Sequence, residues 1–141
     1  MNATKKLTKP MLAALSELAA IRGPIHQYDD AAERRKLAMH KQGLVLARAI
    51  AKLYPGTKVR SNMGGIAVSG EVYMHGDNVW FQISQSLGGV ALMWRRPKNA
   101  RDSVRWDADG QNRYIDLSDN AAQVQSQIEE MLSYFDKWSA A

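Results

Sequence analysis

The spacing of apolar residues changes twice along the chain, and this change constrains the fold more than any other feature. Apolar residues recur at helical spacing over residues 8–54, alternate with polar residues over 58–117, and return to helical spacing from 119 onward. A period of 3.6 is typical of amphipathic helices, and a period of two is typical of half-buried strands. The sequence therefore predicts an α+β domain: two N-terminal helices, an antiparallel sheet of four to five strands, and a C-terminal helix packed on the sheet.

Capping and breaking residues set the expected helix limits. Thr8 is an N-cap residue for a first helix over about 8–22, which Gly23-Pro24 ends. Asp30, with Glu33 three residues later, predicts the start of a second helix that ends at Pro55-Gly56. Its basic first half, which includes His40, is expected at the surface, and its apolar second half is expected in the core. A third helix is expected over about 119–138, capped by Ser118 or Asp119.

The residues around Gly76-Asp77 predict a β-hairpin. If these two residues form the turn, Tyr73 pairs with Trp80 and Val72 with Phe81, so apolar side chains meet on one face and aromatic ones on the other. A loop with an odd number of residues would mix the two faces, so an even loop is favoured. Ile66 and Val68 are assigned to the apolar face, and further strands are expected at about 90–96, 102–106 and 113–117.

Length and composition exclude several classes of protein. The 141 residues fit one domain spanning 1–141, with residues 1–7 expected to form a flexible basic tail. The chain has no cysteine, which excludes disulfides, thiolate zinc sites and cysteine nucleophiles. No apolar run approaches the ~20 residues that cross a bilayer, and the first ten residues lack the apolar core of a secretory signal. We therefore expect an intracellular protein without membrane partners.

The net charge of +5 is unevenly distributed. Residues 1–60 hold 12 Lys or Arg against 4 Asp or Glu, residues 61–117 hold 6 of each, and residues 118–141 hold 1 against 4. The basic character therefore belongs to the N-terminal part and the acidic character to the last helix. Such asymmetry indicates either a surface that binds polyanions or electrostatic pairing between the two ends of the chain.

No sequence motif indicates catalysis. His26, His40 and His75 do not form a metal-binding pair such as HExxH, and no nucleotide-binding or nucleophile-elbow motif is present. We therefore expect a protein that is not an enzyme, with no catalytic residues, no metal and no cofactor. An enzyme remains the third hypothesis, and it requires Glu71 to meet Asp77 or Asp116 in a pocket.

The outward face of the predicted hairpin is the first candidate binding site. Tyr73 and Trp80 stand there beside hydrogen-bonding residues such as Gln82, an arrangement typical of platforms that stack single-stranded nucleic acid. Two other interpretations stay open. The aromatic pair also occurs as ordinary cross-strand stabilisation, and a helix covering this face would place both rings in the core.

Clusters of cations form the remaining candidates for nucleic-acid or partner binding. One lies at the start of the second helix, one in the segment that leads into the first strands, and one in the turn after residue 94. Phosphate contact is the functional interpretation, and a solvated basic surface is the ordinary one. The residues concerned are Arg34, Arg35, Lys36, Lys41, Arg60, Asn62, Arg95, Arg96, Lys98 and Arg101.

Residues 59–85 contain a distinctive motif. It consists of Arg60-Ser61-Asn62, Gly64-Gly65 and Ala67–Val72, followed by His75. This segment resembles a stretch found in small uncharacterised proteins of bacteriophages and plasmids. The resemblance covers about a fifth of the chain and carries no catalytic residue. It implies a mobile genetic element as the context, and hence the cytoplasm of a bacterial host as the location.

Two functional hypotheses follow. The first is a non-enzymatic phage or plasmid accessory protein that binds nucleic acid through its basic N-terminal half and its aromatic sheet face. The alternative is a protein–protein inhibitor of a host defence system, either an anti-CRISPR or an anti-restriction factor, since Trp, Tyr and Arg are also the residues enriched in interface hot spots. A homodimer stays open in both cases.

Overall fold

The protein was analysed as a computed structural model that describes residues 7–25, 28–86, 88–97 and 112–140. The α+β prediction is confirmed. The expected strand at 102–106 and residues 1–6 of the expected tail lie outside the described residues. The elements, in chain order, are α1 (Lys9–Ala19), α2 (Asp30–Ala51), β1 (Lys58–Asn62), β2 (Glu71–His75), β3 (Trp80–Ser86), β4 (Gly89–Trp94), β5 (Arg113–Asp116) and α3 (Ala121–Ala140).

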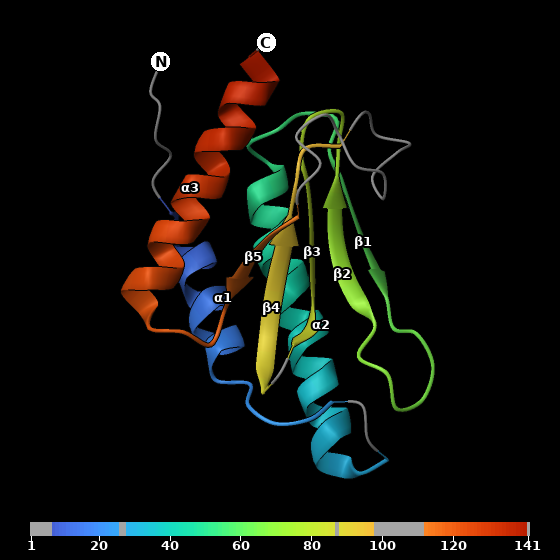
Figure 1. Ribbon diagram of the computed structural model, residues 1–141. Coiled ribbons are helices and arrows are strands. Elements are labelled where there is room, and N and C mark those ends of the chain that lie inside the picture. The colour runs from blue at the N-terminus through green and yellow to red at the C-terminus, as the bar shows by residue number, and fades with distance from the viewer. Residues whose placement is uncertain (1–6, 26–27, 87, 98–111, 141) are drawn as a thin grey trace.

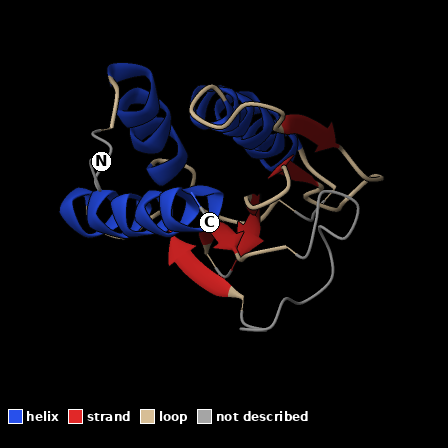
Figure 2. Cartoon of the chain, turned by 90° about the horizontal axis from the view of Figure 1, so that it is seen from above, coloured by secondary structure: helices blue, strands red, loops and turns tan. Residues whose placement is uncertain are grey.

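The five strands form one antiparallel sheet in which spatial order follows chain order, from β1 at one edge to β5 at the other. Figures 1 and 2 show the three helices on the same side of this sheet. The core lies between the two layers and includes the fully buried Met74, Phe81, Ile83 and Leu92. Because side chains alternate along a strand, every second residue of each strand is left on the face away from the helices.

Side-chain caps define the three helix starts. Thr8 Oγ1 accepts a hydrogen bond from the backbone N–H of Met11 at 3.4 Å, which confirms the first predicted cap. The second cap is Asp29 rather than Asp30, because Asp29 has the extended backbone that an N-cap requires and its Oδ1 accepts from the N–H of Ala32 at 2.8 Å. The third helix is capped by Asn120 through the N–H of Gln123 at 2.8 Å, and not by Ser118 or Asp119.

The hairpin register differs from the prediction by two residues. Met74 pairs with Phe81 and His75 pairs with Trp80, so the loop spans residues 76–79. The N–H of Gly76 donates to the carbonyl of Val79 at 2.9 Å, which closes this four-residue loop. The prediction of a two-residue turn was wrong, but the prediction of an even loop was right. The assignment of residues to the two faces is therefore unchanged.

Residues 63–70 form a loop between β1 and β2, whereas the alternating pattern had placed Ile66 and Val68 in a strand. Both side chains are exposed, at 75% and 44%. The backbone cannot continue as a strand here because Gly64, Ala67 and Gly70 all have positive φ. A Cβ atom on Gly70 would collide with the carbonyl oxygen of Asn62, so glycine is required at that position.

Candidate nucleic-acid interface on the open sheet face

The register aligns one row of side chains across all five strands on the face away from the helices. Arg60 pairs with Tyr73, Tyr73 with Gln82, Gln82 with Met93, and Met93 with Tyr114. We call this the central row. Residues directly opposite in an antiparallel sheet lie on the same face, and neighbouring strands are about 4.8 Å apart. Tyr73 and Tyr114, three strands apart, are therefore about 14 Å from each other.

The residues of the central row are all at least partly exposed. Tyr114 is 65% exposed and Arg60 is exposed, while Tyr73, Gln82 and Met93 are half-buried. The buried residues of all three helices belong to the core on the other face, so no helix within the described ranges covers the row. One of the open interpretations, a helix over this face, is thereby wrong for the residues that the structure describes. The row combines a cation, two phenol rings and an amide.

A second row, toward the β2–β3 loop, contains Lys58, His75 and Trp80. Trp80 was expected to be an exposed stacking residue, but it is only 3% exposed. Its ring lies beneath the guanidinium of Arg95, which is 4.3 Å from the ring centroid and is itself buried. Arg95 Nη1 also donates to Asn112 Oδ1 at 3.1 Å. Both residues are therefore occupied with each other, and neither is free for a ligand.

The third row is acidic. Asn62 pairs with Glu71 at the β1 edge, and Ala91 pairs with Asp116 at the β5 edge. This row therefore carries one carboxylate on β2 and one on β5, whereas the other two rows carry the cations Lys58 and Arg60. The open face is therefore divided into a cationic part and an anionic part, and a polyanion is attracted only to the first.

The four cations predicted at the start of α2 have different environments. Arg34 and Lys41 are exposed, as expected for phosphate contacts. Arg35 Nη1 donates to the carbonyl of Pro24 at 2.8 Å. Lys36 was expected at the surface but is 6% exposed, and its Nζ donates to the carbonyl of Gly65 at 3.0 Å. Because the side chain of Lys36 is buried and bonded in this way, it holds the β1–β2 loop rather than standing free for a phosphate.

His40 was also expected at the surface and is buried one turn after Lys36, at 4% exposure. Its Nε2 lies 2.8 Å from the carbonyl of Ser69, and its Nδ1 lies 2.9 Å from Ser61 Oγ. Since a carbonyl only accepts, Nε2 carries the hydrogen in this arrangement. The chain from Ser61 to Ser69 is thus held against α2 by two polar side chains of the helix, Lys36 and His40.

The third predicted cation cluster is only partly described. Arg96 is half-buried, with its guanidinium 5.7 Å from the ring centroid of Trp138. Arg95 is the buried residue over Trp80. Lys98 and Arg101 lie outside the described residues.

The basic half of α2 is not covered by the acidic last helix. The polar contact between α3 and the end of the α2 region is made by Tyr54, whose hydroxyl donates to Asp136 Oδ1 at 2.9 Å and to the Leu132 carbonyl at 3.2 Å. Burial, reinforced by Asp136, raises the pKa of Tyr54 far above its ordinary value of 10.0. Arg34 lies near the start of α2 and Lys41 near its middle, and both are exposed.

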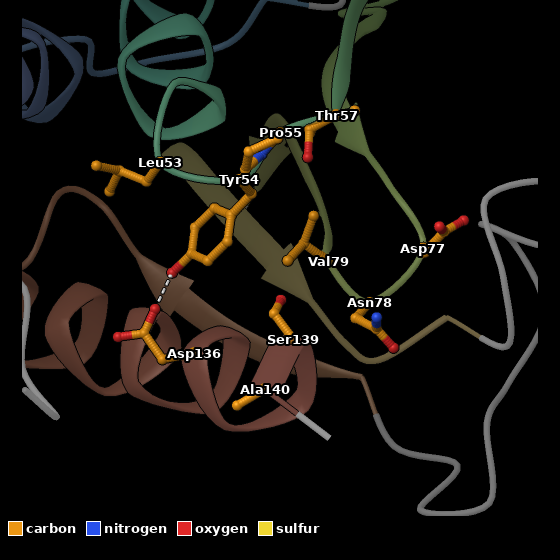
Figure 3. A pocket seen from close by; sticks show the side chains of 11 residues that line it. Leu53, Tyr54, Pro55, Thr57, Asp77, Asn78, Val79, Asp136, Ser139 and Ala140 are labelled. Carbon is orange, nitrogen blue, oxygen red and sulfur yellow. Dashed lines mark hydrogen bonds between the residues drawn. The ribbon is translucent and has the colours of Figure 1, made fainter. Parts of the chain in front are cut away.

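A cavity of about 430 Å³ lies beside Tyr54, between the end of the α2 region, the β2–β3 loop and the end of α3 (Figure 3). Asp77 and Asp136 both line it. Glu71, at the other end of β2, is not among its lining residues, and three strand spacings, about 14 Å, separate Glu71 from Asp116. Neither of the two predicted pairs, Glu71 with Asp77 and Glu71 with Asp116, is therefore brought together in this cavity.

Comparison with protein-family models, with curated proteins and with solved structures gives no match for this chain. Across the described parts of the chain, no three His, Cys, Asp or Glu side chains gather as metal ligands. No helix within those parts is both long and apolar enough to cross a membrane.

Proposed function

We propose that this protein is a non-enzymatic binding protein that takes single-stranded nucleic acid on the open face of its sheet. One observation supports the proposal above all others, namely the central row of Arg60, Tyr73, Gln82, Met93 and Tyr114, which crosses five strands on a face that no described helix covers. The resemblance of residues 59–85 to phage and plasmid proteins supports an accessory role in a mobile genetic element.

The chemistry of the row matches that ligand. Phenol rings stack on bases of any sequence, and a sheet presenting two or three aromatic residues is a recurrent way of holding unstacked bases. Arg60 and Lys58 lie at the β1 edge of the same face, where they reach phosphates, and Gln82 offers an amide to base edges. In this proposal Tyr73 and Tyr114 supply stacking, with Tyr114 in the role that the sequence had suggested for Trp80.

The test is fluorescence anisotropy with labelled dT and rU oligonucleotides of about twelve nucleotides, a length within the range of single-strand sites. Binding should weaken steeply as salt is added, because phosphate contacts release counterions. The variant Tyr114→Ala should weaken binding roughly tenfold, since stacking contributes about 1–3 kcal/mol per base. Arg60→Ala should lower the slope of log K against log salt by about one.

The matched control is Tyr28→Ala. Tyr28 is 81% exposed and stands just before α2, away from the sheet face. Removing it tests whether any exposed tyrosine contributes equally. No binding at low salt, or equal losses in Tyr114→Ala and Tyr28→Ala, would contradict the proposal.

A further inference from the structure

We propose that the free edge of β1 docks an extended segment of another protein, one in which acidic residues alternate with apolar residues. The proposal does not rest on the nucleic-acid function: it shares Arg60 with the central row, but its other residues belong to the edge of the sheet and the neighbouring helix. It follows from four features of the structure: an open edge, an overhanging helix, the charge at that edge, and an exposed apolar loop.

The edge is open for strand addition. Among the strands that the structure describes, β1 pairs only with β2, and four of its five residues are exposed while Val59 is half-buried. The outer edge of such a strand carries backbone N–H and C=O groups that another chain can pair with. Addition of an extended peptide to a sheet edge is a recurrent mode of protein recognition. At the other edge, β5 has only four residues and α3 packs against it.

Helix α2 overhangs this edge. The side of α2 that contacts β1 and β2 is marked by His40, which lies 2.9 Å from Ser61 Oγ, and by Gly43, where a Cβ would stand 3.2 Å from Val72. Met39 and Leu46 lie to one side of this contact, toward α1, and are fully buried. By helical geometry, the stripe on the other side faces outward beyond β1. That stripe consists of Leu37, Lys41, Leu44 and Arg48.

The two faces of an added strand would meet different chemistry. Side chains on the helix side would lie beneath Leu37, which is 52% exposed, and Leu44, which is half-buried. Side chains on the other side would lie beside Lys58 and Arg60, both exposed on the open face. Because strand residues alternate between faces, this surface fits a segment in which apolar and acidic residues alternate.

The charge around the edge is net positive. Lys41 and Arg48 add two exposed cations to those of β1. The carboxylates nearest in sequence and register are Glu33, one turn before Leu37, and Glu71, which pairs with Asn62 at the end of β1. Four cations against two carboxylates favour an acidic partner.

The β1–β2 loop extends the apolar surface past the end of the strand. Met63, Ile66 and Val68 are 37%, 75% and 44% exposed. The bonds from Lys36 to Gly65 and from His40 to Ser69 hold this loop against α2, so the surface is ordered before binding, which lowers the entropic cost of association. Ala67 has φ 64, a conformation that a non-glycine residue adopts only when its surroundings impose it.

A second copy of this chain fits the edge poorly. If two β1 strands paired antiparallel about their centres, each Arg60 would stand opposite the other, and like charges directly opposite destabilise a sheet. The occupant that the charge favours is therefore a different and acidic chain.

The experiment uses labelled synthetic peptides of about eight residues, a usual strand length, in which Glu and Val alternate. Controls are a peptide of the same composition in scrambled order and a peptide of alternating Lys and Val. We expect only the alternating Glu–Val peptide to bind in fluorescence anisotropy. Hydrogen exchange of the bound protein should show slower exchange at alternate amides of residues 58–62, because only every second N–H points outward.

Two variants with matched controls test the surface. Arg60→Glu and Leu37→Glu should each weaken peptide binding about tenfold. Arg60→Glu replaces an attraction to the acidic peptide by a repulsion, and Leu37→Glu replaces an apolar contact by a charge that must lose its water. The control Lys137→Glu reverses an exposed charge on α3, which packs at the opposite edge of the sheet, and the control Val45→Glu changes an exposed apolar residue on the outer side of α2. Both should leave binding unchanged. All four positions are exposed, so the fold should persist.

Several outcomes would overturn the proposal. One is equal affinity for the alternating and the scrambled Glu–Val peptides. Another is peptide binding that does not slow hydrogen exchange at β1. A third is a loss of affinity in the control variants equal to that in Arg60→Glu and Leu37→Glu. Protection of β1 by an oligonucleotide but not by peptide would make the edge a nucleic-acid surface. Concentration-dependent dimerisation that protects β1 without peptide would make it a self-association surface. The variant Tyr114→Ala should leave peptide affinity unchanged, so a failure here is separable from failure of the proposed function.

Discussion

Each face of the sheet holds a buried tryptophan beside an arginine, but the two surroundings are different. On the helix side, Trp94 packs against Tyr134, Phe135 and Trp138 of α3, with ring centroids 5.4–6.1 Å away, and Arg113 lies 5.0 Å above its ring. On the open side, the guanidinium of Arg95 lies over Trp80, 4.3 Å from the centroid of its ring.

The difference shows how one sheet provides both a core and a binding surface. Helix-side residues are closed off by side chains from another layer, so their contribution is to stability. Open-side residues depend on contacts within the sheet, so most of them stay accessible. Arg95 covers Trp80 at one corner of the open face, and no helix of the described residues covers the central row. Substitutions on the helix side should therefore cost more stability than substitutions on the open face.

The variant Phe81→Ala should be the most destabilising. Phe81 is fully buried on the helix side, and truncation of such a residue costs about 3–5 kcal/mol through lost burial and the cavity left behind. Urea unfolding followed by far-UV circular dichroism measures the free energy. A loss below 1 kcal/mol would mean that the helix layer does not close tightly over β3.

The variant Tyr54→Phe should cost about 1–2 kcal/mol, because the buried carbonyl of Leu132 and the carboxylate of Asp136 lose their donor. The variant should also change how the free energy of unfolding depends on pH in alkaline solution. The folded protein holds the proton of Tyr54 more tightly than the unfolded chain, so the wild type should lose stability as pH rises above 10.0.

Urea titrations at pH 8 and at pH values above 10 test this second effect. The loss of stability between them should be smaller in Tyr54→Phe than in the wild type. Identical pH dependence in the two proteins would show that Tyr54 is not buried beneath α3.

The variant Arg95→Lys should cost about 1 kcal/mol. A guanidinium stacked on a desolvated ring is worth up to about 2 kcal/mol, and lysine keeps the charge while losing the planar stack and the fork that reaches Asn112. Denaturant unfolding gives the free energy. The matched control Arg96→Lys, at a half-buried position 5.7 Å from Trp138, should cost less.

The variant Tyr114→Ala should change the unfolding free energy by less than about 0.5 kcal/mol, because substitutions at exposed positions rarely do more. Tyr114 is 65% exposed on the open face. Thermal unfolding by calorimetry provides the check. A loss of several kcal/mol would show that this face is structural, and would remove the contrast between the two faces.

The sequence predicted the fold class and the two faces because both depend on periodicity. The period of the apolar residues identifies a helix or a strand even when the predicted ends of the element are wrong. A register error of two residues leaves each side chain on the same face of the sheet. The positions of individual charges could not be predicted in this way. Lys36 and His40 read as solvated residues of a basic helix, yet a loop 29 residues later in the chain supplies carbonyls for both.

The candidate site was predicted in part. Tyr73 is on the open face as expected, and Arg60, which was expected in a turn, joins it there from β1. Trp80 is buried, because Arg95 directly follows β4, the strand that pairs with β3, and reaches its ring. Tyr114 was not predicted as a site residue. The alternating pattern of residues 113–117 could have identified it, because Tyr114 is next to the buried Ile115 in the strand and so points to the opposite face.

The meander also bears on how the protein forms. Among the described strands, every ladder joins two that follow one another in the chain, and topologies of this kind fold quickly for their size. The contacts of α3 with the sheet are longer in range, since its Phe135 and Trp138 meet Trp94 across more than forty residues. Folding should therefore end with the docking of the last helix, and substitutions in α3 should raise the unfolding rate more than they lower the folding rate.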